Sequence, residues 1–316
     1  MFIGMSIRPR VRSGHSILLF TIRATAISGC PVNYEKFHKD EIITAFRQAN
    51  DFWEVETVTA KICSAAEAIS VIKDGDHVAT YMWSMCGTPG YLYRALAASS
   101  ATDLTLYIEN FLPGPPGTME LGYPDPTMLL AHVKKIVTPF LGGRFVGRIG
   151  ITSDFMGDLI HSGKLETEIT THGVFVERLH AGAMGLGGFY SPIGVGTIVA
   201  AGKETRVIDG KEYIFEKSIT PDVGLIKAAR ADKLGNLVYH GSARGANPVI
   251  AMASKVNIVE VDEIVEPGEL DPELIVTPGI YVDYLVKIPE DNISGAKNLK
   301  ELAKFGVALM NTKGVK

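Results

Sequence analysis

The feature that most constrains this chain is a short apolar segment followed at once by two polar residues and a run of structure breakers. Leu104–Ile108 (LTLYI) is apolar, β-branched and aromatic, which is typical of a buried strand. Glu109 and Asn110 come next, and the prolines and glycines of 113–117 can continue neither a strand nor a helix. The polar pair therefore lies at the carboxyl end of a strand, which is the ligand-binding edge of open α/β sheets. By themselves these residues also fit a simpler role for Glu109, as a helix cap or an arginine partner.

The segments before this strand alternate between helix and strand signals. Residues 65–72 carry small and apolar side chains at helical spacing, and residues 78–83 have the composition of a strand. A turn at 86–90 and a helix through 91–96 then lead to the strand at 104–108. This is the spacing of a βαβ unit, so the predicted fold class is α/β: an open, mainly parallel or mixed sheet covered by helices.

The rest of the chain continues this alternation. Residues 206–215 predict a β-hairpin, with Asp209 and Gly210 as its two-residue turn. Further strands are predicted at 136–138, 223–228, 237–239, 256–261 and 280–286, and helices at 155–162, 174–180, around 250–253 and at 299–305.

Composition and charge exclude several classes of protein. The net charge of -4 gives no electrostatic reason to expect a nucleic-acid partner. No apolar run approaches the roughly 20 residues that a membrane helix needs, so no membrane association is expected. The three cysteines lie far apart and form no C-x-x-C motif, which favours a reducing, cytoplasmic compartment.

Residues 1–57 are treated as an N-terminal extension, and 58–316 as the folded domain. Residues 1–33 contain four arginines but no Asp or Glu, with a short apolar run at 17–22. This composition fits an organelle transit peptide better than a secretory signal, because Arg23 interrupts the apolar region. A start assigned too far upstream is the reading we favour, since no Met lies between Met5 and Met82.

Metal and classical nucleophile sites are not supported. The eight histidines are scattered, with no pair at i, i+3 or i, i+4, so no metal site is expected. No G-x-S-x-G motif occurs, and Cys86 fits a small buried residue beside a turn. A second glycine-rich stretch at 182–196 matches neither a Rossmann fingerprint nor a P-loop. A strand-end carboxylate and two glycine-rich loops with free backbone N–H groups would suit acyl transfer.

Three longer blocks carry a family resemblance. They read THGVFVERLHAGAMGLGGFYSPIGVGT at 171–197, GKEYIFEKSITPDVGLIKAARADKLGNLVYHGSAR up to Arg244, and VNIVEVDEIVEPGELDPELIVTPGIYVDYLV up to Val286. Together they resemble the alpha subunit of class I CoA-transferases of the succinyl-CoA:3-oxoacid and acetate/acetoacetate type, over about residues 58–290. The resemblance implies coenzyme A as an acyl-CoA substrate, no permanently bound cofactor, and a partner that is the beta subunit. It also implies a glutamate nucleophile that holds CoA as a glutamyl thioester.

Two departures from this family pattern concern the site. Asp74, Gly75, Gly87 and Pro89 match the alpha signature, but residues 81–83 (Tyr, Met, Trp) stand where it has G-G-F. Larger side chains there would reshape the acyl pocket. The family nucleophile belongs to the beta subunit, in a motif like S-E-N-G that is absent here, whereas this chain has Glu109 at the corresponding strand end.

The predicted site follows from both lines of reasoning. Glu109 and Asn110 are the candidate catalytic residues, with the covalent step expected on the partner. Gly87, Pro89, Gly194 and Gly196 are the candidate CoA-binding residues. Three basic residues, Lys227, Arg230 and Arg244, are candidates for the CoA phosphates or else solvated surface charges. A thioester hydrolase that uses Glu109 to activate water, or a non-catalytic scaffold subunit, stay open as alternatives.

Overall fold

A computed structural model describes residues 5–6, 23–24, 59–82, 87–110, 129–141 and 154–289 of the chain. The contacts within the chain divide it into two units, Met1–Thr57 and Val58–Lys316. In the first unit, the short strands β1 (Met5–Ser6) and β2 (Arg23–Ala24) pair antiparallel. The second unit contains the sheet and the candidate site, and everything below concerns it.

The core of the second unit is an open sheet of nine strands. Its order is β3-β14-β13-β11-β4-β5-β6-β7, and β12 pairs with β11 beside this path. The strands are β3 (Lys61–Ile62), β4 (His77–Thr80), β5 (Leu104–Ile108), β6 (Val133–Thr138), β7 (Glu166–Ile169), β11 (Val223–Asp232), β12 (Leu237–Val238), β13 (Val256–Val265) and β14 (Tyr284–Lys287). Every pairing is parallel except that of β12 with β11, so the predicted α/β class with a mainly parallel sheet is confirmed.

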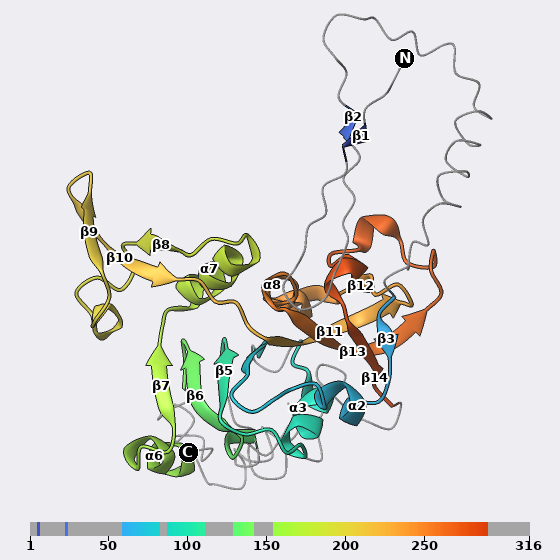
Figure 1. Cartoon of the computed structure of the whole chain (residues 1–316), viewed down its shortest axis with the longest axis horizontal. Coiled ribbons are helices and arrows are strands. Elements are labelled where there is room, and N and C mark those ends of the chain that lie inside the picture. The colour runs from blue at the N-terminus through green and yellow to red at the C-terminus, as the bar shows by residue number, and fades with distance from the viewer. Residues whose placement is uncertain are drawn as a thin grey trace, which may run out of the picture. The chain divides into compact units, whose positions relative to one another are not determined.

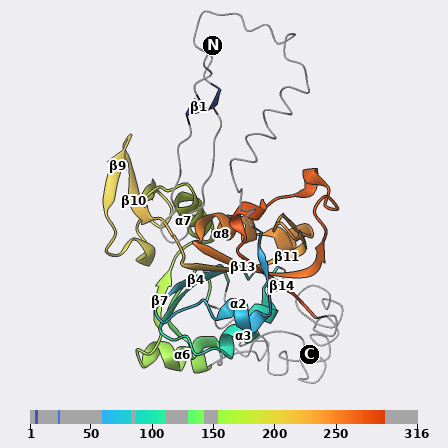
Figure 2. The same ribbon diagram turned by 45° about the vertical axis from the view of Figure 1, so that its right-hand side comes forward.

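Helices cover both faces of this sheet. The helices are α2 (Ala65–Ile69), α3 (Gly90–Ala97), α6 (Asp154–His161), α7 (His172–Ala183) and α8 (Asn247–Ala253). Successive residues of one strand join different core clusters: Leu225 packs with α2 and α3, and Ile226 with α7 and α8. Figures 1 and 2 show α2 and α3 on one side of the sheet and α7 and α8 on the other. Burial on both faces explains why the strands are almost continuously apolar.

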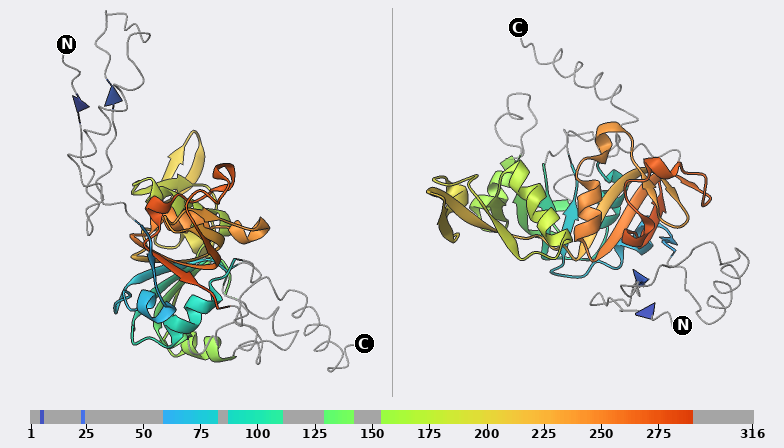
Figure 3. Two further views of the ribbon diagram at one scale, coloured as in Figure 1. Left: turned by 90° about the vertical axis from the view of Figure 1, so that its right-hand side faces the viewer. Right: turned by 90° about the horizontal axis from the view of Figure 1, so that it is seen from above.

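A small antiparallel sheet extends from this body. It has the order β8-β10-β9, from β8 (Gly188–Ser191), β9 (Thr205–Ile208) and β10 (Lys211–Lys217). Figures 1 and 3 show it beyond α7, away from the larger sheet. The predicted hairpin is confirmed: Ile208 pairs with Lys211, and Asp209 and Gly210 both have positive φ, as a two-residue hairpin turn requires.

The order of the strands reverses beside β4. The chain goes from β4 outward through β5 and β6 to β7, and then returns to place β11 on the other side of β4. The connections that leave β4 and β11 therefore run in opposite directions, which opens a crevice at the carboxyl edge of the sheet. This position holds the candidate site.

The described residues also contain four short 3-10 turns, at Ile198–Ala200, Gly241–Arg244, Pro272–Leu274 and Gly279–Tyr281. The last of these corrects the strand predicted over 280–286, because Asn236 accepts a hydrogen bond from the N–H of Gly279 at 2.9 Å and holds a turn there. Strand β14 begins only at Tyr284.

Other differences from the predicted elements are at their ends. Helix α2 stops at Ile69 rather than at residue 72, and β4 stops at Thr80. Strand β7 (ETEI) was not predicted, because it is a mostly exposed edge strand without apolar alternation. The helix predicted at 299–305, together with Trp83 and Cys86, lies outside the described residues.

Candidate functional site

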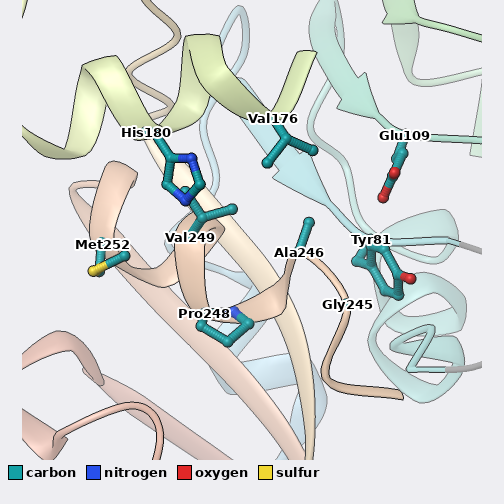
Figure 4. Close-up of a pocket in the computed structure, with 9 residues that line it drawn as sticks. All are labelled: Tyr81, Glu109, Val176, His180, Gly245, Ala246, Pro248, Val249 and Met252. Carbon is teal, nitrogen blue, oxygen red and sulfur yellow. The ribbon is translucent and has the colours of Figure 1, made fainter. Parts of the chain in front are cut away.

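The candidate site is a pocket into which Glu109 projects from the end of β5. Its volume is about 290 Å³. Figure 4 shows Glu109 and Tyr81 at one end, His180 and Met252 at the other, and an apolar wall between them. The lining residues come from four places in the chain: Tyr81, Glu109, Val176, His180, Gly245, Ala246, Pro248, Val249 and Met252. The end of β5 and the segment that begins α8, which lie on opposite sides of the switch point, therefore line one pocket.

Glu109 is half-buried, and its surroundings act on its carboxyl group. Burial raises the pKa of Glu109 above the ordinary value of a glutamate, because desolvation penalises the charged form. No ion pair joins Glu109 to a basic side chain of the described residues. Within this part of the chain, the simpler role of an arginine partner is thus not observed.

Asn110 is 8% exposed and follows Glu109 directly. Its buried side-chain oxygen has no hydrogen-bond partner among the described residues. Buried amide oxygens are nearly always paired in folded proteins. Within the described part of the chain, Asn110 therefore has a free hydrogen-bond acceptor next to Glu109.

Gly87, in the glycine-rich loop after β4, packs against the turn that follows β12. This residue has φ +69°, and a Cβ there would lie 2.1 Å from the backbone oxygen of Ala243. The buried Asn247 joins the two loops, because its Nδ2 donates to the backbone oxygens of Gly87 at 3.1 Å and Ala243 at 3.0 Å. Its Oδ1 accepts from the N–H of Lys227 in β11 at 3.2 Å. One side chain thus connects the loop after β4, the turn after β12 and the central strand.

The start of helix α3 is fixed by a carboxylate from another strand. Pro89 immediately precedes the helix, and its side chain forms no capping hydrogen bond. The buried Glu260 of β13 accepts hydrogen bonds from the N–H groups of Tyr91 at 2.8 Å and Leu92 at 3.0 Å. These N–H groups have no partner within the helix, so the carboxylate of Glu260 caps the N-terminus of α3.

Tyr81 occupies one of the positions where the family signature has glycine. Its ring lies against Gly245, where an added Cβ would come within 2.0 Å of the ring. Tyr81 and Met82 are both buried. The larger side chain at 81 is therefore accommodated by a glycine on the opposite loop, and it narrows the pocket at the Glu109 end.

Gly194 and Gly196 lie elsewhere. They follow β8, both with positive φ, in the part of the chain that holds the small sheet. Neither is among the residues that line the pocket of Glu109. The structure thus brings Glu109 and the loop of Gly87 to one edge of the sheet, while the role predicted for Gly194 and Gly196 stays a prediction.

The three basic candidates differ in their surroundings. The side chain of Lys227 is 8% exposed and pairs with Glu260 at 3.2 Å, so the interpretation as a solvated surface charge is wrong for it. Arg230 is exposed and pairs with Glu263 at 2.7 Å. Arg244 is exposed in the turn beside the pocket, and of the three it is the one that forms no ion pair with a described residue.

Sequence reasoning missed several residues that build this site. His180 was not singled out from the sequence as a site residue; it lies in the last turn of α7, partly exposed, and lines the pocket. Its ring nitrogen Nδ1 also lies 3.4 Å from a carboxylate oxygen of Glu177. The roles of Asn247 and Glu260 rest on contacts between distant parts of the chain, which no local pattern reveals. A possible signal was Asn247 before Pro248, a pair typical of a helix start.

Two further observations bound the chemistry of the described residues. No group of three or more His, Cys, Asp or Glu side chains among them is placed to hold a metal ion. Within the same ranges, none of the helices has the length and apolar character needed to cross a membrane.

Comparison with known proteins identifies the family. Residues 62–288 match the Coenzyme A transferase family, and the chain belongs to it. The A subunit of the succinyl-CoA:3-ketoacid coenzyme A transferase of Helicobacter pylori is 40% identical over 223 residues, which cover 70% of this chain and 89% of that protein. The A subunit of the 3-oxoadipate CoA-transferase of Pseudomonas putida is 39% identical over 225 residues, covering 71% and 92%. The alpha subunit of the acetate CoA-transferase of Escherichia coli K12 is 35% identical, covering 72% and 96%.

Solved structures share the fold. An acyl-CoA transferase of Escherichia coli O157:H7 superposes with a TM-score of 0.62 at 22% identity, over 75% of this chain. This chain spans only about half of that protein, 48% of its length. The glutaconate coenzyme A-transferase of Acidaminococcus fermentans gives a TM-score of 0.57 at 22% identity, over 74% of this chain and 77% of its own. The chain is thus a CoA-transferase subunit of the A type by sequence, and it shares the fold of these solved structures.

Proposed function

We propose that this chain works with a beta subunit to move CoA reversibly between a short acyl-CoA and a small carboxylic or 3-oxo acid. Family membership and the names of the relatives, which are A or alpha subunits, support this proposal. The observation that carries it for this chain is the pocket of Glu109, which opens at the switch point of the sheet and has a size suited to a small acyl group.

The chemistry of the proposal is a series of acyl exchanges. A glutamate carboxylate on the partner attacks the thioester carbonyl, and the CoA thiolate leaves as an acyl-glutamyl anhydride forms. The thiolate then attacks the glutamyl carbonyl, which releases the donor acid and leaves a glutamyl-CoA thioester. The carboxylate of the acceptor acid reverses these two steps. No oxidant, metal or permanently bound cofactor is needed, because CoA itself is a substrate.

This chain contributes the walls of the acyl site. Glu109 lines the pocket in a supporting role, and the side-chain oxygen of Asn110, which has no partner among the described residues, offers a hydrogen-bond acceptor. The loops of Gly87–Pro89 and Gly194–Gly196 supply backbone N–H groups toward CoA or the developing oxyanion. We also propose a cytoplasmic location, for which the widely spaced cysteines are the support.

The experiment that tests the proposal measures acyl-CoA consumption by the chain co-purified with its beta partner. Consumption should require an added acceptor acid and should yield the new acyl-CoA in equal amount. Release of free CoA without any acceptor would instead identify a thioester hydrolase. Activity that Glu109→Ala leaves unchanged, with the partner present, would support the scaffold alternative for this chain.

A further inference from the structure

The pocket of Glu109 has a composition that restricts which acids it can hold. Its wall is formed by aliphatic and thioether groups of α7 and α8, from Val176, Ala246, Val249 and Met252. A volume of about 290 Å³ is at the small end for ligand pockets, so it fits a short chain and not CoA. An apolar wall gains free energy from methylene groups, roughly 25 cal/mol for each Å² removed from water.

The charged groups of the pocket are the second part of the argument. Among the described residues that line the pocket, only Glu109 carries a carboxyl group. The same residues include no Lys or Arg, and His180 is the one side chain among them that can become cationic. His180 lies at the opposite end from Glu109 and has Glu177 beside it. Proteins that bind a carboxylate ligand use Arg or Lys as its partner, because charge-assisted hydrogen bonds offset desolvation.

The relatives do not decide this question. Their names include a succinyl-CoA and a 3-oxoadipate transferase, which act on dicarboxylic acids, and an acetate transferase, which acts on a monocarboxylic acid. All three are similar to this chain at 35–40% identity. The acid must therefore be inferred from the pocket itself.

From the apolar wall and a carboxyl group that forms no ion pair with any described residue, we infer that this site accepts monocarboxylic acids with short apolar chains and rejects dicarboxylic acids. The inference places the reacting carboxylate of the acid at the thioester and the far end of its chain in the pocket, beside Glu109 and Tyr81. A second carboxylate at that end would lie beside Glu109 and be repelled by it. A methyl or hydroxyl group there would be tolerated. Glu109 is then the residue that determines specificity, and the inference rests on the proposed function.

The test compares two acids of equal chain length, butanoate and succinate, as CoA acceptors. The chain is co-purified with its beta partner, and acetyl-CoA is the donor. Butanoate should give a kcat/KM at least tenfold higher than succinate. Glu109→Gln removes the charge at nearly constant shape, and the succinate-to-butanoate ratio of kcat/KM should rise at least tenfold. Glu273→Gln, the same change at an exposed site on a 3-10 turn, should leave the ratio unchanged.

A second variant tests the apolar wall without touching the carboxyl group. Ala246→Val adds two methyl groups to the wall, so hexanoate should lose at least threefold in kcat/KM relative to propanoate. Equal use of succinate and butanoate by the wild-type complex, or an unchanged ratio in Glu109→Gln, would overturn the inference while CoA transfer itself stands. A complex that transfers CoA to no acid would overturn the proposed function, and the inference with it.

Discussion

Asn247 joins the two loops that meet at the switch point, and Asn247→Asp tests how much that connection stabilises the fold. The substitution keeps the size of the side chain and the acceptor for the N–H of Lys227. It replaces the Nδ2 donor with an oxygen, so the backbone oxygens of Gly87 and Ala243 lose their hydrogen bonds. It also places a carboxyl group at a position that is 0% exposed.

The structure sets the size of the effect. Each backbone oxygen left without its partner costs about 1–3 kcal/mol, so two of them cost about 2–6 kcal/mol. The introduced carboxyl group either carries a buried charge or takes up a proton, and both raise the cost. The free energy of unfolding should therefore fall by at least about 2 kcal/mol and by as much as about 6 kcal/mol, a large part of the stability of a typical domain.

Urea unfolding followed by far-UV circular dichroism measures this change. The midpoint for Asn247→Asp should fall well below that of the wild type with little change in slope. Ser242→Ala, an exposed change in the neighbouring turn, should leave the midpoint within experimental error. A loss smaller than about 1 kcal/mol for Asn247→Asp would refute the reasoning, because the removal of two buried hydrogen bonds should cost more than that.

Three further changes give distinct outcomes. Gly245→Ala should lower thermal stability for two reasons: its Cβ would meet the ring of Tyr81 at 2.0 Å, and its backbone has φ +39°, which favours glycine. The part of the loss that comes from the clash should disappear in a Tyr81→Ala background, while the part from backbone strain should remain; simple addition of the two losses would contradict this. Glu109→Gln should gain stability over the wild type as pH rises from the ordinary pKa of a glutamate through the pKa that burial raises in the folded state, because the wild type loses stability over that interval. A pH-independent difference in urea midpoints would exclude this. Glu168→Gln should lower the free energy of unfolding by about 2 kcal/mol at pH 7, because it removes the charge that pairs with Arg178. The pair is largely shielded from water, since the side chain of Arg178 is 9% exposed and that of Glu168 is 31% exposed. Burial alone would raise the pKa of Glu168, but its hydrogen-bonded cations hold that pKa below its ordinary value, so the cost should vanish in acid.

The sequence contained enough information for the main sheet because its strands are buried on both faces. Leu104–Ile108 and the strands near 223 and 256 are apolar runs of strand length, and each lies where such runs belong, in the interior of a parallel sheet. The turn at Asp209 and Gly210 was equally local, because only a tight hairpin turn needs two residues with positive φ. These features depend on the properties of neighbouring residues.

The site could be predicted only where it follows from topology. Glu109 was found because a polar residue at a strand's carboxyl end must face the ligand-binding edge. The pairing of Tyr81 with Gly245, or of Glu260 with the start of α3, joins residues more than 150 positions apart in sequence. Such contacts depend on the order of the strands and on packing, so the pattern of either segment alone does not contain them. Lys227 illustrates the same point, since its burial against Glu260 depends on the neighbouring strand.

The central claim is that this chain forms the acyl site of a CoA-transferase whose glutamate nucleophile is on the beta partner. Intact-mass spectrometry tests it most directly, after incubation with an acyl-CoA and no acceptor, on the chain alone and co-purified with its beta partner. We predict a CoA-sized adduct on the partner and none on this chain in either sample. An adduct on this chain that Glu109→Ala abolishes would contradict the claim, because the nucleophile would then be Glu109 itself.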